Sequence, residues 1–354
     1  MSTFSKTILH WYSKNKRPLP WRNTKDPYKV WLSEIILQQT RVVQGLPYYE
    51  KFVTAYPMVE DLAAAREDDV LKLWQGLGYY SRARNLHATA KIVVSEFNGN
   101  FPLTYVDLLK LKGIGDYTAS AIASICYHEA RPVVDGNVYR VLARYFGIDL
   151  PINESKGIRY FKELAIEIMD TQNIADYNQG IMEFGAKQCT PQNPDCSSCP
   201  LGASCVGLQQ NRIKELPVKI KKGKIRKRYF NYLVLLDDHG YTQLNKRTSD
   251  GIWKNLFEFP LIESQKLLGE QEVRTEIHNT TEISFKNLFS WQEQPIVHKL
   301  SHQHLITTFW IVETNGEIAS GIPLAKIEAY PVPVLMADFI ETFKNSYFWP
   351  KETV

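Results

Sequence analysis

Residues 189–205 read CTPQNPDCSSCPLGASC and hold four of the five cysteines of the chain, spaced Cys189-x6-Cys196-x2-Cys199-x5-Cys205. Clustered thiols in a chain without a secretion signal indicate metal binding rather than disulfide bonds. Zinc sites usually pair two CxxC knuckles, whereas only one short spacing occurs here. The long arms on both sides suit a larger group, so we favour a [4Fe–4S] cluster and keep zinc as the alternative.

The chain changes character on either side of this cysteine stretch. Before it, from about residue 5 to 190, apolar residues recur at helical spacing and are broken by Gly, Pro and Asn. After it, residues 212–228 hold nine Lys/Arg against one acid, and strand-like patterns begin at residue 229. The sequence predicts an all-α domain over residues 1–207, a basic linker over residues 208–228 and an α+β domain over residues 229–354.

The apolar patterns also predict individual elements. Helices are expected at residues 30–43, 61–74, 86–97, 105–111, 118–127, 138–146, 158–169, 178–187, 263–275 and 334–344. Strands are expected at residues 229–236, 241–246, 294–299 and 307–313.

The composition of the 354 residues, 44% hydrophobic and 23% charged, is that of a globular protein with about two domains. No run of 18 apolar residues occurs, and the N-terminus has no uninterrupted apolar segment. We therefore expect a cytoplasmic protein with no membrane association. The net charge of +4 does not by itself indicate a nucleic-acid partner, and the basic stretch fits either a solvated linker or a contact to the DNA backbone.

The cysteine spacing resembles the cluster loop of the endonuclease III-like DNA glycosylases, and further motifs follow in that family's order. Residues 111–119 (LKGIGDYTA) look like its helix–hairpin–helix, and residues 134–138 (VDGNV) resemble the loop with its catalytic aspartate. Residues 31–40 (WLSEIILQQT) and 19–22 (LPWR) are similar to the MutY branch, the adenine DNA glycosylases. The resemblance implies base excision repair of adenine opposite 8-oxoguanine or guanine by a bacterial, nucleoid-associated enzyme with a [4Fe–4S] cluster.

The hairpin has the glycines that close contact with a phosphate requires. Gly113 and Gly115 let the backbone approach where a Cβ would collide, and the amides that begin the next helix form an anion site. An ordinary corner between two helices is the alternative. Lys112 stands where the family mostly has proline, and Asp116 adds a negative charge near the expected phosphate.

Breaking the bond between adenine and deoxyribose requires a proton for the base and an anion beside the cationic sugar. By resemblance Glu34 protonates adenine at N7, and burial beside apolar neighbours would raise its pKa for that purpose. Asp135 precedes a helical run, so it can be an N-cap or, by resemblance, the carboxylate that faces the sugar. Asn137 and Tyr117 match positions that hold Asp135 and the nucleophilic water.

Tyr117 also distinguishes two reaction types. The bifunctional endonuclease III enzymes carry a lysine at this position, which forms a Schiff base with the sugar. A phenol cannot form an imine, so the resemblance implies a monofunctional glycosylase.

The target base must leave the helix to be attacked. The resemblance places three residues around the extruded adenine: Arg17, Trp21 and Glu183. It assigns three others to wedging into the duplex and contacting the partner guanine: Gln39, Thr40 and Tyr79.

The C-terminal part resembles the Nudix-like domain of the MutY enzymes, through residues 251–260 (GIWKNLFEFP). The metal-binding REXXEE helix of Nudix pyrophosphatases is absent, so we expect recognition rather than hydrolysis. The family's Phe-Ser-His segment, which senses 8-oxoguanine, reads Leu300-Ser301-His302 here. The Ser301 hydroxyl can both donate and accept, which suits the N7–H and O8 of the oxidised base.

The predicted partner is double-stranded DNA with A:8-oxoguanine or A:G mispairs, bound by a monomer. Two alternatives stay open: a thymine or other mismatch glycosylase on the same scaffold, and a non-catalytic iron–sulfur DNA-binding protein. The catalytic reading requires that the carboxyls of Glu34 and Asp135 share one cavity.

Overall fold

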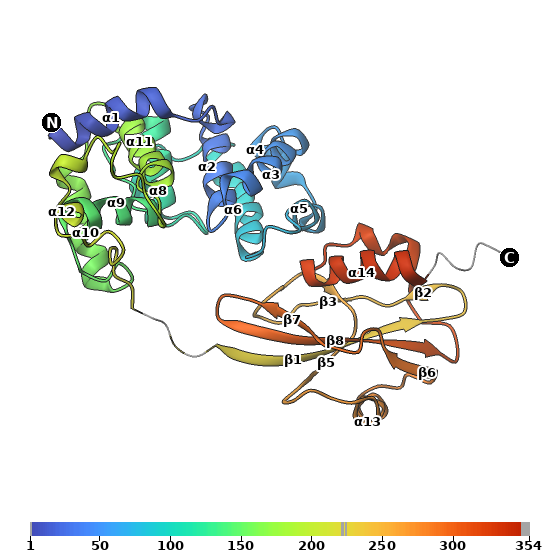
Figure 1. Ribbon diagram of the computed structural model, residues 1–354. Coiled ribbons are helices and arrows are strands. Elements are labelled where there is room, and N and C mark those ends of the chain that lie inside the picture. The colour runs from blue at the N-terminus through green and yellow to red at the C-terminus, as the bar shows by residue number, and fades with distance from the viewer. Residues whose placement is uncertain (1, 221–222, 224, 348–354) are drawn as a thin grey trace. The chain divides into compact units, whose positions relative to one another are not determined.

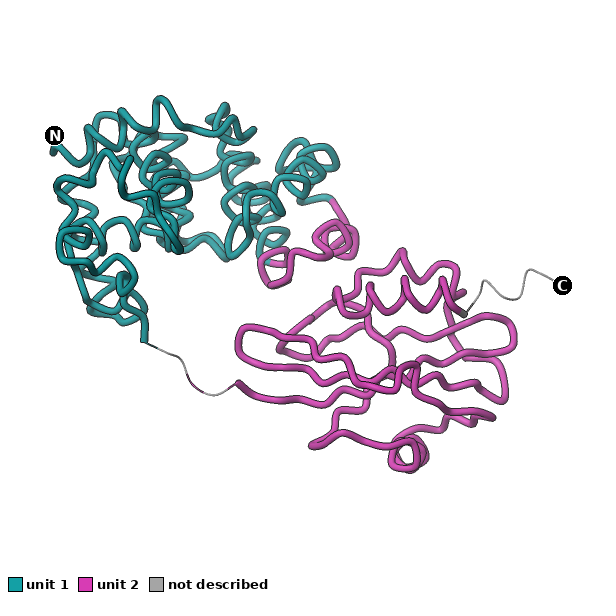
Figure 2. The backbone as a smooth tube through the Cα atoms, in the orientation of Figure 1, with its two compact units in different colours: residues 1–64, 85–222 teal, residues 65–84, 223–354 magenta. Residues whose placement is uncertain are grey.

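The computed structural model describes residues 2–220, 223 and 225–347 and divides into two compact units (Figures 1 and 2). Unit 1 comprises residues 1–64 and 85–222, and unit 2 comprises residues 65–84 and 223–354. Unit 1 is helical and unit 2 is built on a sheet accompanied by helices, so the predicted fold class is confirmed. Residues 65–84 group with the sheet unit, which differs from the predicted domain ranges.

Unit 1 contains most of the helices. They are α1 (Thr3–Asn15), η1 (Pro20–Arg22), α2 (Pro27–Leu37), α3 (Val42–Ala55), α4 (Val59–Ala64), α6 (Ser81–Phe97), α7 (Tyr105–Leu108), α8 (Asp116–Tyr127), α9 (Gly136–Phe146), α10 (Ser155–Ile168), α11 (Ile174–Lys187), η2 (Gly202–Ser204) and α12 (Val206–Gln209). Helix α6 begins in unit 2 and continues into unit 1, whereas α5 (Glu67–Leu73) belongs to unit 2. Among the helices described, none combines the length and the apolar character that a membrane span requires.

Two predicted helices are each divided in the structure. The segment 30–43 was expected to be one helix, but α2 ends at Leu37 and α3 begins at Val42. Gln39 between them has a φ of 58°, in the left-handed region that an α-helix cannot include. The segment 61–74 is likewise divided into α4 and α5. Apolar residues resume after each break, which is why each segment was predicted as one helix.

Helix α11 packs closely against two other helices through glycine. A Cβ on Gly180 would lie 3.1 Å from Tyr12 Cβ of α1. A Cβ on Gly185 would lie 2.7 Å from Asn137 Cβ and 2.9 Å from the Asn137 carbonyl oxygen of α9. Such distances require the absence of a side chain, so the two glycines set how near α11 lies to α1 and α9.

Unit 2 has a mixed five-stranded sheet in the order β5-β1-β8-β6, with β7 also paired to β8. Strands β1 (Arg226–Leu236) and β8 (Gln303–Thr314) are parallel, and the other pairs are antiparallel. The remaining sheet strands are β5 (Leu261–Ser264), β6 (Phe285–Ser290) and β7 (Ile296–Lys299). Two small antiparallel pairs accompany the sheet: β2 (Tyr241–Thr242) with β9 (Ile322–Pro323), and β3 (Asn245–Lys246) with β4 (Phe257–Glu258).

A helix covers each face of this sheet (Figure 1). Alternate residues of β1, Leu233 and Leu235, share a buried cluster with Val273 and Ile277 of α13 (Glu270–Thr280). On the other face the rings of Phe309 (β8) and Phe339 (α14, Val334–Tyr347) stack with centroids 3.9 Å apart. The short helix η3 (Leu324–Ala329) precedes α14.

The predicted helix 263–275 is wrong in position, because residues 261–264 form strand β5 and the helix begins only at Glu270. The strand β6 was not predicted, since its exposed and buried residues do not alternate regularly. The expected strand 241–246 is divided into β2 and β3, which pair with different partners.

Much of the predicted linker, residues 208–228, lies against unit 1 or in the sheet. Arg144 Nε donates to the Leu216 carbonyl at 3.0 Å, and Ile152 N donates to the Val218 carbonyl at 3.0 Å. Strand β1 begins at Arg226. Residues 221, 222 and 224 of the linker lie outside the described residues.

Candidate active site

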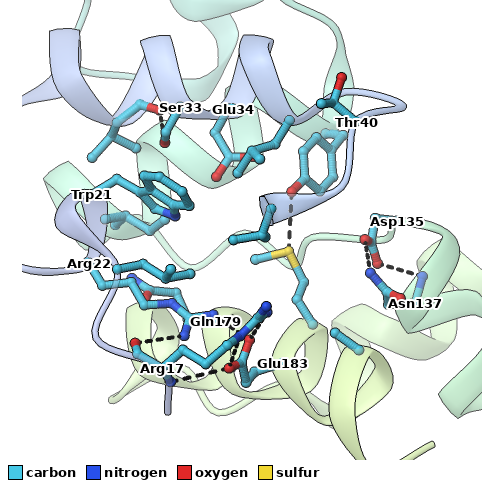
Figure 3. A pocket seen from close by; sticks show the side chains of 18 residues that line it. Arg17, Trp21, Arg22, Ser33, Glu34, Thr40, Asp135, Asn137, Gln179 and Glu183 are labelled. Atoms are coloured by element: carbon cyan, nitrogen blue, oxygen red, sulfur yellow. Dashed lines mark hydrogen bonds and ion pairs between the residues drawn. The ribbon is translucent and has the colours of Figure 1, made fainter. Parts of the chain in front are cut away.

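Unit 1 contains a cavity of about 170 Å³ between η1, α2, α8, α11 and the start of α9 (Figure 3). Eight of the predicted site residues line it: Arg17, Trp21, Glu34, Thr40, Tyr117, Asp135, Asn137 and Glu183. The carboxyls of residues 34 and 135 thus share one cavity, as the catalytic reading requires. Lining residues that the sequence did not single out include Arg22, Ser33, Gln179 and Met182.

Glu34 projects into this cavity from α2 (Figure 3).

 Every side chain from Val30 to Ile36 is buried, and Glu34 itself is only 8% exposed. Burial and, to a smaller degree, the charge of Asp135 raise the pKa of Glu34, while a hydrogen bond from Tyr117 and the charge of Arg22 lower it, and the net pKa is about 7. Near neutral pH the carboxyl can therefore hold a proton and give it up.

Asp135 caps the N-terminus of α9. Its Oδ1 accepts hydrogen bonds from Asn137 N at 2.9 Å and Val138 N at 2.8 Å, and its Oδ2 accepts one from Asn137 Nδ2 at 2.8 Å. Burial raises the pKa of Asp135 above its usual value, while these three donors and the nearby Arg140 lower it. The capping and catalytic readings of this residue are thus compatible, because the same donors that cap the helix favour the ionised carboxylate.

Tyr117 lies in the first turn of α8, beside both carboxyls. Its hydroxyl is 3.1 Å from Met182 Sδ and close enough to Glu34 to hydrogen bond with the carboxylate. Burial, followed by the charges of Glu34 and Asp135, raises the pKa of Tyr117 well above its usual value. The phenol therefore stays protonated at neutral pH, and its O–H donates to Met182 Sδ.

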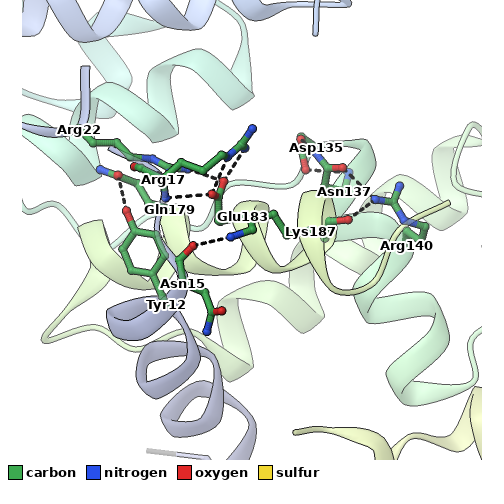
Figure 4. Close-up of polar contacts among 11 residues, drawn as sticks. Tyr12, Asn15, Arg17, Arg22, Asp135, Asn137, Arg140, Gln179, Glu183 and Lys187 are labelled. Atoms are coloured by element: carbon green, nitrogen blue, oxygen red, sulfur yellow. Dashed lines mark hydrogen bonds and ion pairs between the residues drawn. The ribbon is translucent and has the colours of Figure 1, made fainter. Parts of the chain in front are cut away.

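Glu183 is held by two arginines at the other side of the cavity (Figures 3 and 4). Its carboxylate accepts hydrogen bonds from Arg17 Nε at 2.7 Å, Arg17 Nη2 at 2.6 Å and Arg22 Nη2 at 2.7 Å, and its side chain is fully buried. Burial would raise the pKa of Glu183, but the two guanidinium groups together lower it to about 2. Glu183 is therefore a permanent anion that orients Arg17 and Arg22.

The sequence holds a signal for two further cavity residues, Arg22 and Gln179. Arg22 ends the LPWR motif, and Gln179 lies one helical turn before Glu183, so it shares a face of α11 with that residue. Gln179 lines the cavity, and its Oε1 accepts a hydrogen bond from Tyr12 OH at 2.8 Å.

Arg140 connects the start of α9 to the cysteine stretch (Figure 4). Its Nη2 donates to Asn137 Oδ1 at 2.9 Å and to the Gly185 carbonyl at 2.6 Å, and its Nε donates to the Cys189 carbonyl at 2.7 Å. The guanidinium is therefore connected to Asp135 through the Asn137 side chain. It also hydrogen bonds directly to the backbone of Cys189, the first cysteine of the stretch.

The four clustered cysteines fold back on one another after α11. Burial raises the pKa of Cys196, Cys199 and Cys205, and in each case the neighbouring Cys189 thiol raises it further. The Cys205 thiol also donates to the Arg144 carbonyl at 3.4 Å. Within the described residues, no group of three or more His, Cys, Asp or Glu side chains is arranged to hold a single metal ion.

The two hairpin glycines, Gly113 and Gly115, differ in the space that surrounds their Cα atoms. Gly113 has a φ of 77°, and a Cβ there would lie 2.7 Å from Asn85 Cβ, so the fold itself requires glycine. A Cβ on Gly115 would meet no atom of the described chain within 4 Å. The surface beside Gly115, at the start of α8, is thus open for an outside group to approach closely.

The remaining predicted residues lie in loops. Gln39 lies in the break between α2 and α3 and is not part of the cavity lining. In unit 2 a second cavity, of about 450 Å³, brings together Tyr79, Ser301 and His302 with Trp253. Tyr79 has a φ of 47° and is 51% exposed, so its ring is presented to the outside rather than packed in a core.

The fold and the site define a class of protein: a helix–hairpin–helix enzyme with two buried carboxyls in one cavity, one of which accepts hydrogen bonds from three donors. The family model described as "HhH-GPD superfamily base excision DNA repair protein" matches residues 32–165, and the model described as "NUDIX domain" matches residues 231–342. The structure is similar to that of a thermostable thymine-DNA glycosylase, with a TM-score of 0.54 and 30% sequence identity. The match covers 58% of this chain and 95% of the thymine-DNA glycosylase chain.

Similar sequences narrow the class further. The chain is 43% identical to the adenine DNA glycosylase of Buchnera aphidicola subsp. Schizaphis graminum, covering 73% of this chain and 74% of the relative. It is 37% identical to that of Buchnera aphidicola subsp. Acyrthosiphon pisum, covering 98% and 99%. The chain belongs to the adenine DNA glycosylase family and is an enzyme of base excision repair.

Proposed function

We propose that this enzyme hydrolyses the N-glycosidic bond of adenine mispaired with 8-oxoguanine or guanine in double-stranded DNA, as a monomer and without cutting the strand. The observation that carries the proposal is the pair Glu34 and Asp135 in one cavity. The pKa of about 7 for Glu34 suits a proton donor, and three hydrogen-bond donors around Asp135 suit an anion.

In the proposed reaction the flipped adenine enters the cavity and Glu34 gives its proton to adenine N7. The base then leaves as a neutral molecule, while the Asp135 carboxylate stabilises the cationic sugar. Asn137 keeps Asp135 in place through two hydrogen bonds, and Tyr117 hydrogen bonds to the Glu34 carboxyl. Attack by water on the sugar, with its proton passing to a carboxylate, completes hydrolysis.

The monofunctional assignment rests on the cavity lining. Tyr117 occupies the hairpin position, and none of the described residues that line the cavity is a lysine. No lining amine is therefore available to form an imine with the sugar. Borohydride should trap no efficient covalent adduct with DNA, and an adduct formed in high yield would contradict this part of the proposal.

Recognition of 8-oxoguanine is assigned to the cavity of unit 2. Ser301 Oγ and His302 Nδ1 are 3.3 Å apart, and Tyr79 and Trp253 supply aromatic surface in the same cavity. A hydroxyl can accept from the N7–H of the oxidised base or donate to its O8, and an aromatic ring can stack on a base. Gln39 and Thr40 are proposed to contact the duplex beside the extruded adenine.

A [4Fe–4S] cluster is proposed on Cys189, Cys196, Cys199 and Cys205, whose gathering in one loop supports it. When bound, the cluster would crosslink the loop through thiolate–iron bonds and could take up or release an electron. The chain's own residues hold that loop to α9 through Arg140 and Arg144. A purified protein with a broad absorption band in the visible would support the cluster, whereas a colourless protein with zinc would overturn it.

One assay tests the function as a whole. Single-turnover release of adenine from a duplex with an A:8-oxoguanine pair is expected, together with slower release from A:G and none of thymine from T:G. Efficient thymine release would favour the mismatch-glycosylase alternative, in keeping with the thymine-DNA glycosylase of similar structure. Absence of activity on every duplex, with DNA binding retained, would favour a non-catalytic DNA-binding protein.

A further inference from the structure

Lys162, near the middle of α10, joins three segments of unit 1. Its Nζ donates to Asp116 Oδ2 at 3.0 Å, to the Pro132 carbonyl at 3.1 Å and to Ser120 Oγ at 3.4 Å. The side chain is 24% exposed, so most of its surface is covered by these partners and their neighbours. A lysine amine has three protons to donate, and each has an acceptor here.

Asp116 is the first residue of α8 and directly follows Gly115 of the hairpin. Its side chain is 53% exposed, and its other oxygen accepts a hydrogen bond from Tyr105 OH at 2.5 Å. The open surface beside Gly115 is where the proposed DNA phosphate would approach, so an uncompensated carboxylate on Asp116 would repel it. Lys162 is the cation that the structure places on this carboxylate.

The Pro132 carbonyl belongs to the loop that leads to Asp135. The same loop is held by Asn178, which accepts from Val133 N at 3.2 Å and donates to the Arg131 carbonyl at 2.8 Å. Lys162 therefore contacts both the end of the hairpin and the segment that carries the catalytic aspartate.

We propose that Lys162 is a positioning residue for DNA binding, which cancels the charge of Asp116 at the hairpin and ties the hairpin to the loop before Asp135. The proposal rests on the proposed function in taking the hairpin as a contact to the DNA backbone. It explains why this chain can carry an aspartate at an anion site: the aspartate is paired from α10, a helix more than 40 residues further along the chain.

Four variants test the charge relation: Lys162→Met, Asp116→Asn, the double variant Lys162→Met/Asp116→Asn, and the control Lys344→Met. Lys344 is a matched control because it is 28% exposed and pairs with Glu328 at 2.9 Å, but it lies on α14 of unit 2. Affinity for an undamaged duplex is measured at several salt concentrations, together with single-turnover adenine release at saturating enzyme. Thermal unfolding of each variant checks that the fold is retained.

Lys162→Met is expected to weaken duplex binding by about three- to tenfold at low salt, with a smaller effect at high salt because charge repulsion is screened. The double variant should recover most of this loss, since no carboxylate is left to repel the phosphate. Asp116→Asn alone should bind as tightly as the parent or more tightly, and Lys344→Met should bind as the parent does.

Two outcomes would overturn the proposal. Undiminished binding by Lys162→Met would show that Asp116 needs no partner, and a loss that Asp116→Asn does not restore would show that Lys162 acts in another way. If Lys162→Met does not fold, weaker binding by Asp116→Asn alone would still contradict the charge argument. Failure of the proposed function is separate, because it would appear as absent adenine release by the parent enzyme with duplex binding intact.

Discussion

At the scale of single residues, two carboxyls differ because their surroundings differ. Glu34 is surrounded by the buried side chains of α2, so loss of water dominates and its pKa rises to about 7. Asp135 is also buried, but two backbone amides and one side-chain amide point at it. The same chemical group can therefore serve as acid in one place and as anion in the other.

The pKa of Glu34 predicts how the excision rate depends on pH. The protonated form is the active one, so the single-turnover rate should fall as the pH rises through about 7. Glu34→Gln cannot donate a proton and should lose activity by about a hundredfold or more, the usual contribution of a general acid. The exposed residue Glu167 on α10 offers a control, since Glu167→Gln should keep the parent's rate and pH profile. An unchanged rate in Glu34→Gln would disprove the assignment of the acid.

The same pKa has a consequence for stability. A carboxyl whose pKa is about 4.5 in the unfolded chain and about 7 in the folded one binds a proton more tightly when folded. Stability is then fully present below the unfolded pKa and is lost as the pH rises through the folded pKa. Glu34→Gln removes this loss, so it should raise the melting temperature at about pH 8 and change it little at about pH 4, with a ceiling of about 3 kcal/mol. Equal shifts at both pH values would contradict the raised pKa.

At the scale of elements, the site depends on how α9, α11 and the cysteine loop meet. Gly185 lets α11 approach the backbone of Asn137, and the Arg140 side chain then bonds to both Gly185 and Cys189. The capping of α9 by Asp135 is local, whereas these contacts join residues more than 40 positions apart. A disturbance of the cysteine loop can therefore reach Asn137 through one side chain.

Arg140→Met tests this connection. The variant removes the donor to Asn137 Oδ1 and to the carbonyls of Gly136, Gly185 and Cys189, which leaves these acceptors without that partner. We expect slower adenine excision by about tenfold and weaker retention of visible absorption during purification, with thermal unfolding at lower temperature. Arg159→Met, at an exposed position on α10, is the control and should behave as the parent does. Normal excision by a folded Arg140→Met protein would show that Asn137 is held without it.

At the scale of the whole molecule, excision and recognition are assigned to different units. The cavity with the two carboxyls lies within unit 1, and the cavity with Tyr79, Ser301 and His302 lies within unit 2. The sheet of unit 2 has a helix packed on each face, and these packing contacts involve none of the residues that line the cavity of unit 1. Specificity for the oxidised base and the rate of bond breaking should therefore respond to different substitutions.

Ser301→Ala tests that separation. Loss of the hydroxyl should reduce the preference for A:8-oxoguanine over A:G by about three- to tenfold, as expected for one lost hydrogen bond, while the rate on A:G stays near the parent's. The preference is the ratio of single-turnover rates measured below saturation on the two duplexes. Ser95→Ala, at an exposed position on α6, serves as the control. An unchanged ratio would remove Ser301 from lesion recognition.

The sequence by itself determined the fold class and named eight of the residues that line the cavity, because periodicity and motif spacing are short-range signals. Helical periodicity, the cysteine spacing and the motifs around Glu34 and Asp135 are visible within a few residues. The same local signals did not show the break at Gln39, the position of α13 or strand β6, whose exposed and buried residues do not alternate regularly.

Only the tertiary structure decided what the site residues do to one another. It placed Glu183 between Arg17 and Arg22, brought Gln179 to the cavity and joined Lys162 to Asp116. It also set the pKa of Glu34, because that value depends on which side chains exclude water and which charges lie nearby. These relations connect residues that are far apart in the chain, and their distances and burial exist only once the helices have packed.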